Sequence, residues 1–90
     1  MAKIRIPTPL RSYTKEKDEV EVAGATVAEA LADLERQCPG IGARLLDEKG
    51  ALRRYINVFH NDEDIRFLEE LQTKVGTGDR LAIVPAIAGG

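Results

Sequence analysis

The chain has 90 residues, 43% of them hydrophobic, and its 13 basic and 15 acidic side chains give a formal net charge of −2. This length suits one compact domain with little room for a deep substrate cavity, so a self-contained enzyme is not expected. The interspersed charges lack the basic stripe of a nucleic-acid-binding protein, and no long apolar run suggests a signal peptide or a membrane span, so we expect a cytoplasmic protein that binds neither nucleic acid nor membranes.

Two strands are predicted near the start of the chain. Ile4 and Ile6 alternate with basic residues, and the prolines at positions 7 and 9 end the pattern. Val20 and Val22 alternate with glutamates in the same way. The polar stretch 12–18 has the composition of a turn, so we expect the two strands to form a hairpin.

A helix is predicted to begin at Thr26. Thr26 is followed three residues later by Glu29, the capping-box spacing in which both side chains satisfy backbone N–H groups that the first helical turn leaves free. The pair Pro39-Gly40 ends the pattern, and residues 41–46 have the composition of a short second helix. One face of the main helix is apolar and is expected to cover the sheet: Val27, Ala30, Leu31 and Leu34.

The middle of the chain predicts a third strand and a return. Residues 55–59 are rich in β-branched and aromatic side chains, with Ile56 and Val58 on one face. Residues 61–64 have the composition of a tight turn. We expect residues 65–67 to pair back across this turn as a short strand, followed by a helical turn over residues 68–71.

The last strand is predicted over Arg80–Pro85, after a turn at residues 76–79. Leu81 and Ile83 point towards the core, and Ala82 and Val84 point to the other face. The order of elements predicts an α+β fold of the β-grasp type, a mixed sheet with one main helix packed across it. We expect one domain over residues 1–85 and a flexible C-terminal tail over residues 86–90, which starts from the sheet centre if the first and last strands are neighbours.

The last two residues, Gly89 and Gly90, suggest chemistry at the C-terminus. A carboxylate is a poor electrophile and must be activated, for example as an acyl-adenylate, before its carbonyl is attacked. The chain has no Gly-x-x-x-x-Gly-Lys-Ser/Thr loop for phosphate, so we expect it to bind no cofactor and a partner enzyme to use the ATP. Glycine has no Cβ and suits entry into a narrow tunnel. Attack by sulfur would give a thiocarboxylate and attack by an amine an amide, and the residues leave both open.

The residues at the end and middle of the chain resemble the ubiquitin-related sulfur carriers of the MoaD and ThiS type. The resemblance rests on the strand order, on residues 57–67 (Asn-Val-Phe-His-Asn-Asp-Glu-Asp-Ile-Arg-Phe), on residues 6–8 and on the ending Pro-Ala-Ile-Ala-Gly-Gly. Within this family it is nearest to the carrier of O-phosphoserine-dependent cysteine biosynthesis. The resemblance implies adenylation of Gly90 by an E1-like enzyme and its conversion to a thiocarboxylate, with Ile87, Ala88 and Gly89 as the tail. It also implies a PLP-dependent cysteine synthase and a metal-dependent peptidase as later partners.

An apolar patch on the outward face of the sheet is a candidate docking surface for a partner. We expect it to continue into the tail at Ile87 and to be bordered by arginines, each of which is equally well explained as a solubilising side chain. The predicted patch consists of Phe59, Ala82 and Val84, with Arg5, Arg66 and Arg80 as its rim.

Three other features favour structural roles. Asp62, Glu63 and Asp64 lack the spacing of a calcium loop and are expected to form a solvated turn, so no metal site is predicted. His60 has no second ligand or nucleophile at a useful spacing and is taken as a strand-end residue. Cys38, the only cysteine, is expected to be a partly buried structural residue in a reducing compartment.

Three alternative functions stay open at this point. As the small subunit of a molybdopterin synthase, the chain would co-purify with a larger subunit. A protein modifier would form isopeptide bonds through Gly90 and give conjugates of higher mass. An interaction domain with an inert tail would tolerate the loss of Gly89 and Gly90.

Overall fold

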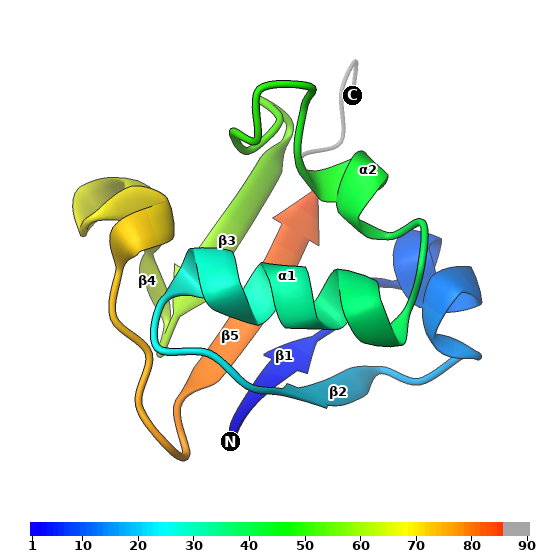
Figure 1. Ribbon diagram of the computed structural model, residues 1–90, viewed down its shortest axis with the longest axis horizontal. Helices are drawn as coiled ribbons and strands as arrows, with labels where there is room; N and C mark the ends of the chain where they lie inside the picture. The colour runs from blue at the N-terminus through cyan, green and yellow to red at the C-terminus, as the bar shows by residue number, and fades with distance from the viewer. Residues whose placement is uncertain (86–90) are drawn as a thin grey trace.

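The computed structural model describes residues 1–85 and consists of one five-stranded mixed sheet with its α-helices on one side (Figure 1). The strand order is β2-β1-β5-β3-β4, in which β1 and β5 are parallel and the other neighbours are antiparallel. This is the predicted β-grasp arrangement. The elements are β1 (Ala2–Arg5), η1 (Thr8–Thr14), β2 (Glu19–Val22), α1 (Val27–Gln37), α2 (Gly42–Leu45), β3 (Ile56–His60), β4 (Glu63–Asp64), η2 (Ile65–Phe67), η3 (Glu70–Gln72) and β5 (Arg80–Pro85).

The first and last strands lie side by side in the middle of the sheet, as the sequence suggested. Ile4 is aligned with Leu81 across the parallel pair, and β3 pairs with residues 81–85 of β5 on its other edge. Both edges of β5 are therefore hydrogen-bonded to neighbouring strands. The strand that leads towards the C-terminus belongs to the most constrained part of the fold.

The predicted capping of α1 is confirmed. The Thr26 side-chain oxygen accepts a hydrogen bond from the Glu29 backbone N–H (3.2 Å), and a Glu29 carboxylate oxygen accepts one from Ala25 N–H (2.9 Å). The carboxylate thus reaches one residue further back than in the usual capping box. The apolar face predicted for this helix is buried against the sheet, through Val27, Ala30, Leu31 and Leu34.

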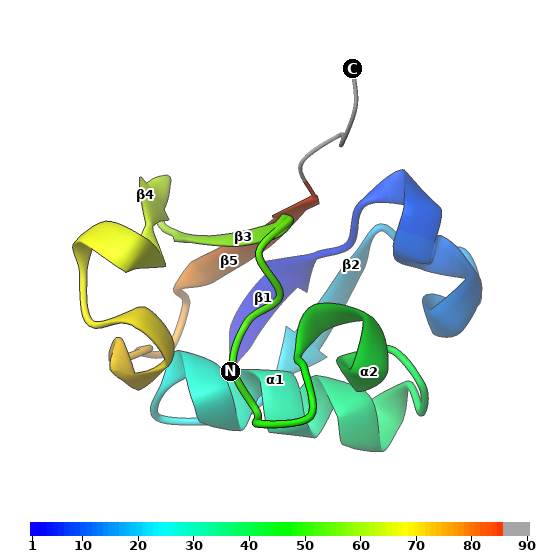
Figure 2. The ribbon, with the colours of Figure 1, turned by 90° about the horizontal axis from the view of Figure 1, so that it is seen from above.

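Figure 2 shows that α1 and α2 lie on one side of the sheet, and neither crosses the opposite face. The core lies between these helices and the inner face of the strands. Among the helices within residues 1–85, none is long and apolar enough to cross a membrane. The largest side chains that are completely or almost completely buried are those of Ile4, Ile6, Leu34, Ile41, Leu45, Ile56, Ile65 and Leu81.

Two predictions for the connection after β3 were wrong: the length of its turn and the position of the returning strand. The hairpin turn after β3 has only two central residues, Asn61 and Asp62, both with positive φ (47° and 73°), so pairing resumes at once with Glu63 opposite His60. This is the two-residue turn that matches the twist of a hairpin. The returning strand β4 is therefore Glu63–Asp64, and residues 65–67 form the 3₁₀ helix η2.

The side chain of Asp64 explains why the chain leaves the strand there. Its carboxylate accepts a hydrogen bond from the Arg66 backbone N–H (2.9 Å) and so caps η2, while Ile65 turns into the core. The helical turn predicted over residues 68–71 is found slightly later, as η3. Between β1 and β2, the predicted turn over residues 12–18 overlaps the end of the seven-residue 3₁₀ helix η1, whose first turn contains Pro9.

Candidate functional site

The C-terminal residues predicted to carry the chemistry, Ile87, Ala88, Gly89 and Gly90, lie outside the described residues. The structure describes the strand that leads to them. Pro85, the last described residue, is aligned with Ile56 of β3, so the pairing of β3 with β5 extends to this point. The sheet therefore provides a fixed starting position for the terminal segment.

The three predicted docking residues share the face of the sheet that α1 and α2 leave open. Phe59 on β3 is aligned with Ala82 on β5, and Val84 lies two residues further along the same strand. The Val84 residue is 44% exposed, whereas its inward-pointing neighbour Ile83 is 3% exposed. The structure thus brings Phe59, Ala82 and Val84 together as one patch, which we call the outer patch.

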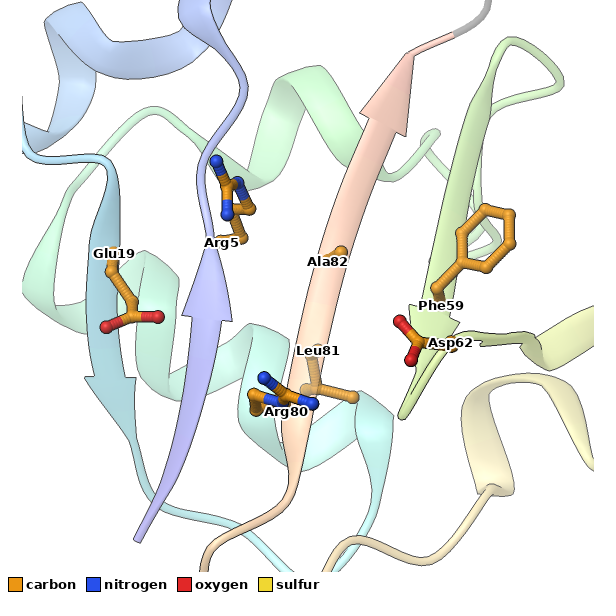
Figure 3. A pocket seen from close by; sticks show the side chains of 7 residues that line it. All are labelled: Arg5, Glu19, Phe59, Asp62, Arg80, Leu81 and Ala82. Carbon is orange, nitrogen blue, oxygen red and sulfur yellow. The ribbon is translucent and has the colours of Figure 1, made fainter.

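A shallow hollow lies over Ala82 because this side chain is much smaller than its neighbours. Figure 3 shows Arg5 on β1, Ala82 on β5 and Phe59 on β3 arranged side by side across the sheet. The hollow has a volume of about 140 Å³ and lies between an arginine and an aromatic ring. Its shape suits a single protruding side chain and is too small for a nucleotide.

Charges of both signs border this hollow. Its lining includes the side chains of Arg5, Arg80, Glu19 and Asp62 (Figure 3). Glu19 also lies 3.9 Å from the amino group of Lys3, an exposed pair that contributes little to stability. The mixed border favours a partner with charges of both signs over a uniformly charged one.

The rim predicted for the patch was right for two arginines and wrong for the third. Arg66 is not among the residues that line the hollow, and its guanidinium donates to the backbone carbonyls of Arg54 and Ile56, each at 3.2 Å. β4 pairs only with Phe59 and His60, so it leaves the earlier part of this β3 edge uncovered. Arg66 therefore satisfies backbone oxygens beside β3 and is committed to the fold.

A polar cluster around Asp79 was missed by the sequence analysis. The Asp79 carboxylate accepts hydrogen bonds from Gly76 N–H (2.7 Å) and the Asn61 side chain (3.3 Å), and it lies 2.8 Å from Nε2 of His60. The bond from Gly76, followed by those from His60 and Asn61, lowers the pKa of Asp79 to about 2. His60 is thus the strand-end residue expected, but it also ties β3 to the turn before β5.

The remaining candidates have structural surroundings. Cys38 caps the end of α1 and packs partly buried against the core, as predicted. Asp62 lies in the hairpin turn and Asp64 caps η2. Among residues 1–85, no group of three His, Cys, Asp or Glu side chains is arranged to hold a metal ion.

Comparison with known proteins shows close relatives along nearly the whole chain. The sulfur carrier protein CysO of Mycobacterium tuberculosis is 42% identical over 89 residues, which cover 97% of this chain and 96% of the relative. The small archaeal modifier protein 3 of Haloferax volcanii is 32% identical over 66 residues, 73% of this chain and 71% of that protein.

A solved structure agrees with the same relationship. The matching chain in the crystal structure of the Amycolatopsis orientalis BexX/CysO complex is 48% identical and superposes with a TM-score of 0.94, with both chains covered completely. The ThiS family matches residues 4–90, a range that includes the terminal glycines as well as the sheet. On the strength of this match and of the shared fold, the chain belongs to the ThiS family.

Proposed function

We propose that this protein is a sulfur carrier whose C-terminal Gly90 is adenylated by an E1-like enzyme, converted to a thiocarboxylate and used as a sulfur donor in cysteine biosynthesis. The observation that carries the proposal is the match to sulfur carriers over nearly the full chain, within a family match that extends to residue 90. The protein is a co-substrate for partner enzymes and not itself an enzyme.

The chemistry needs one activation step and one sulfur-transfer step. The Gly90 carboxylate attacks the α-phosphorus of ATP, which forms an acyl-adenylate and releases pyrophosphate. A sulfur nucleophile such as hydrosulfide then adds to the carbonyl carbon, AMP leaves, and a thiocarboxylate and a proton result. The ATP site and the sulfur source belong to the partner, so this chain supplies the carboxyl group and the surfaces that the partner recognises.

The outer patch is the surface that we assign to the activating enzyme. Phe59 and Val84 lie beside the small Ala82, and the exposed valine leaves apolar area that association would remove from water. Arg5 and Arg80 add charge at its edge. The variants Phe59→Ala and Val84→Asp should bind an immobilised activating enzyme at least ten-fold more weakly, and unchanged binding would remove the outer patch from the proposal.

Later partners are proposed from the family resemblance and the named relatives. A PLP-dependent cysteine synthase would accept the sulfur, and a metal-dependent peptidase would release cysteine from the carrier. The related CysO chain crystallised in a BexX/CysO complex is a carrier captured with another protein, which supports a function through successive partners. All of these steps would take place in the cytoplasm.

A protein modifier is a second candidate, favoured by the similarity to a small archaeal modifier protein. In this case a lysine amine attacks the same activated carbonyl and forms an isopeptide bond. Expression of a tagged chain in its own organism would then give conjugates of higher mass that disappear when Gly90 is deleted. Absence of such conjugates, together with thiocarboxylate formation, would leave the carrier function alone.

Activation is tested by ATP–pyrophosphate exchange with the E1-like enzyme of the same organism. The intact chain should support exchange, and a chain lacking Gly90 should not. The variant Arg36→Gln, at an exposed arginine on α1, is the control and should behave as the intact chain. Equal exchange with and without Gly90 would contradict adenylation at this residue.

A further inference from the structure

A second hollow lies at the end of the sheet where β5 ends. It has a volume of about 210 Å³ and shares no lining residue with the hollow over Ala82. Four segments far apart in sequence meet there: η1, α2, the residues that enter β3, and the end of β5. We call it the tail-base groove, and its lining residues are Pro9, Leu10, Arg44, Tyr55, Ile56 and Pro85.

The groove has an apolar floor and open walls. Leu10 and Ile56 are 8% and 1% exposed and form part of the core. Tyr55, by contrast, is 45% exposed, and Pro9 is also exposed. Tyrosine offers a large contact area with few rotatable bonds, so its ordering on binding costs little conformational entropy. The groove therefore has the composition of a contact site.

Arg44 gives the groove a fixed positive charge. Its Nε donates a hydrogen bond to the Tyr13 hydroxyl oxygen (2.9 Å), an interaction that also raises the pKa of Arg44. None of the carboxylates within residues 1–85 lies within ion-pair distance of this guanidinium. Among residues 1–85 its two terminal nitrogens have no hydrogen-bond acceptor, and a planar carboxylate is the acceptor that fits them best.

The length of the terminal segment decides what comes near this groove. Five residues follow Pro85 up to Gly90, and a chain of that length spans at most about 18 Å. If Gly90 reacts inside a partner, as the proposed function requires, the entrance of the partner's active site must approach Pro85 within that distance. Pro85 itself lines the groove.

We propose that the tail-base groove docks the entrance of the activating enzyme, which presents an apolar side chain to Tyr55 and the groove floor and a carboxylate to Arg44. This inference rests on the proposed function and adds a recognition site to it. The outer patch and the tail-base groove would then hold the carrier at two points, so that the terminal segment starts from a defined position and direction.

The test measures thiocarboxylate formation by intact mass spectrometry at increasing carrier concentration, with the E1-like enzyme of the same organism, ATP and sulfide. The variants are Arg44→Gln and the double variant Arg44→Gln/Tyr55→Ser. Arg36→Gln is the matched control because it removes an exposed arginine outside the groove. All three side chains are exposed, and thermal unfolding checks that each variant is folded.

The double variant should need at least ten-fold more carrier for the half-maximal rate, with the maximal rate within two-fold of the intact chain. Arg44→Gln alone should show part of this shift and a weaker dependence on salt, and the control should show none. A change in the maximal rate of the double variant, with no change in the carrier concentration that gives the half-maximal rate, would overturn the inference.

Other outcomes separate the inference from the proposed function. If the intact chain is thiolated and both groove variants saturate at the same concentration as it does, the groove is not a docking site although the carrier function stands. Faster thiolation of the variants would mean that residues 86–90 occupy the groove, and a changed oligomeric mass would mean that a second copy does. No thiolation of the intact chain beside a thiolated control carrier would overturn both proposals.

Discussion

The two faces of β5 should respond differently to substitution, because one is buried in the core and the other is the face that we propose to contact the activating enzyme. Ile83 is 3% exposed on the inner face, and Val84 is 44% exposed on the outer face of the same strand. Ile83→Ala removes buried apolar volume and leaves a cavity, which costs about 2–5 kcal/mol of the free energy of unfolding. Val84→Asp changes a partly exposed position and should cost no more than about 1 kcal/mol.

These magnitudes can be compared with the total stability. A domain of 90 residues has a free energy of unfolding of about 5–13 kcal/mol, which exceeds the cost of Ile83→Ala except at the lowest end of this range, so most molecules of the variant should be folded at room temperature. Its unfolding midpoint should fall by about 8 °C or more, since each kcal/mol shifts the midpoint by about 4–8 °C at this size.

Urea unfolding followed by circular dichroism, with linear extrapolation to water, measures both free energies. Pull-down and thiolation assays at room temperature then measure function on folded protein. Ile83→Ala should retain binding to the activating enzyme, and Val84→Asp should bind it at least ten-fold more weakly while losing no more than about 1 kcal/mol of stability. The reverse ranking in either assay would show that the inner and outer faces of β5 have been assigned wrongly.

Three further predictions concern stability. Thr26→Ala removes the oxygen that accepts from Glu29 N–H and should cost about 0.5–2 kcal/mol in urea unfolding; an unchanged midpoint would exclude the cap as a stabilising contact. The pKa of Asp79 is lowered from 3.8 to about 2, so its contribution to stability is complete above about pH 4 and is lost as the pH falls towards 2. In Asp79→Asn the urea midpoint should therefore depend less on pH over that range than in the parent protein. An equal dependence on pH in the two proteins would contradict this. Gly24 has φ 156°, and Gly24→Ala would bring a Cβ within 2.8 Å of the α1 backbone, so this variant should have a clearly lower melting temperature. Gly76→Ala, whose Cβ would have no contact closer than 3.6 Å, should change the melting temperature little. Equal shifts in the two variants would refute the steric argument.

Patterns of period two and local capping motifs were enough to predict most of the fold. The alternation over Arg80–Pro85 gave the bounds of β5 correctly, and the spacing of Thr26 and Glu29 located the start of α1. These signals are local, since each depends on residues that lie within one strand or one helical turn. The outer patch followed from them, because facing residues on neighbouring strands can be deduced once inward and outward positions are known.

The errors occurred where the structure depends on single backbone angles or on distant contacts. Residues 65–67 have the composition of a strand, but positive φ values at Asn61 and Asp62 shorten the turn, and the chain leaves β4 after two residues. The 19-residue separation between His60 and Asp79 hides their contact from any local pattern. Arg66 could not be placed either, because the carbonyls to which it donates become neighbours only after β3 and η2 pack together.

The tail-base groove shows the same limit for function. Its residues come from four segments, and none of them has a motif of its own in the sequence. The antiparallel pairing of β3 with β5 places Tyr55 beside Pro85, and the positions of η1 and α2 bring Pro9 and Arg44 to them. The terminal glycines, by contrast, were recognisable in the sequence, although they lie outside the described residues.

The most direct test of the central claim is intact and fragment mass spectrometry of the protein after incubation with ATP, a sulfide source and an extract of its own organism. A chain lacking Gly90 and a known carrier are treated in parallel. The account predicts that one oxygen is replaced by sulfur, that the change maps to the carboxyl group of Gly90, and that the shortened chain is unmodified. If the known carrier is thiolated and the intact chain keeps its original mass, the protein does not carry sulfur at its C-terminus.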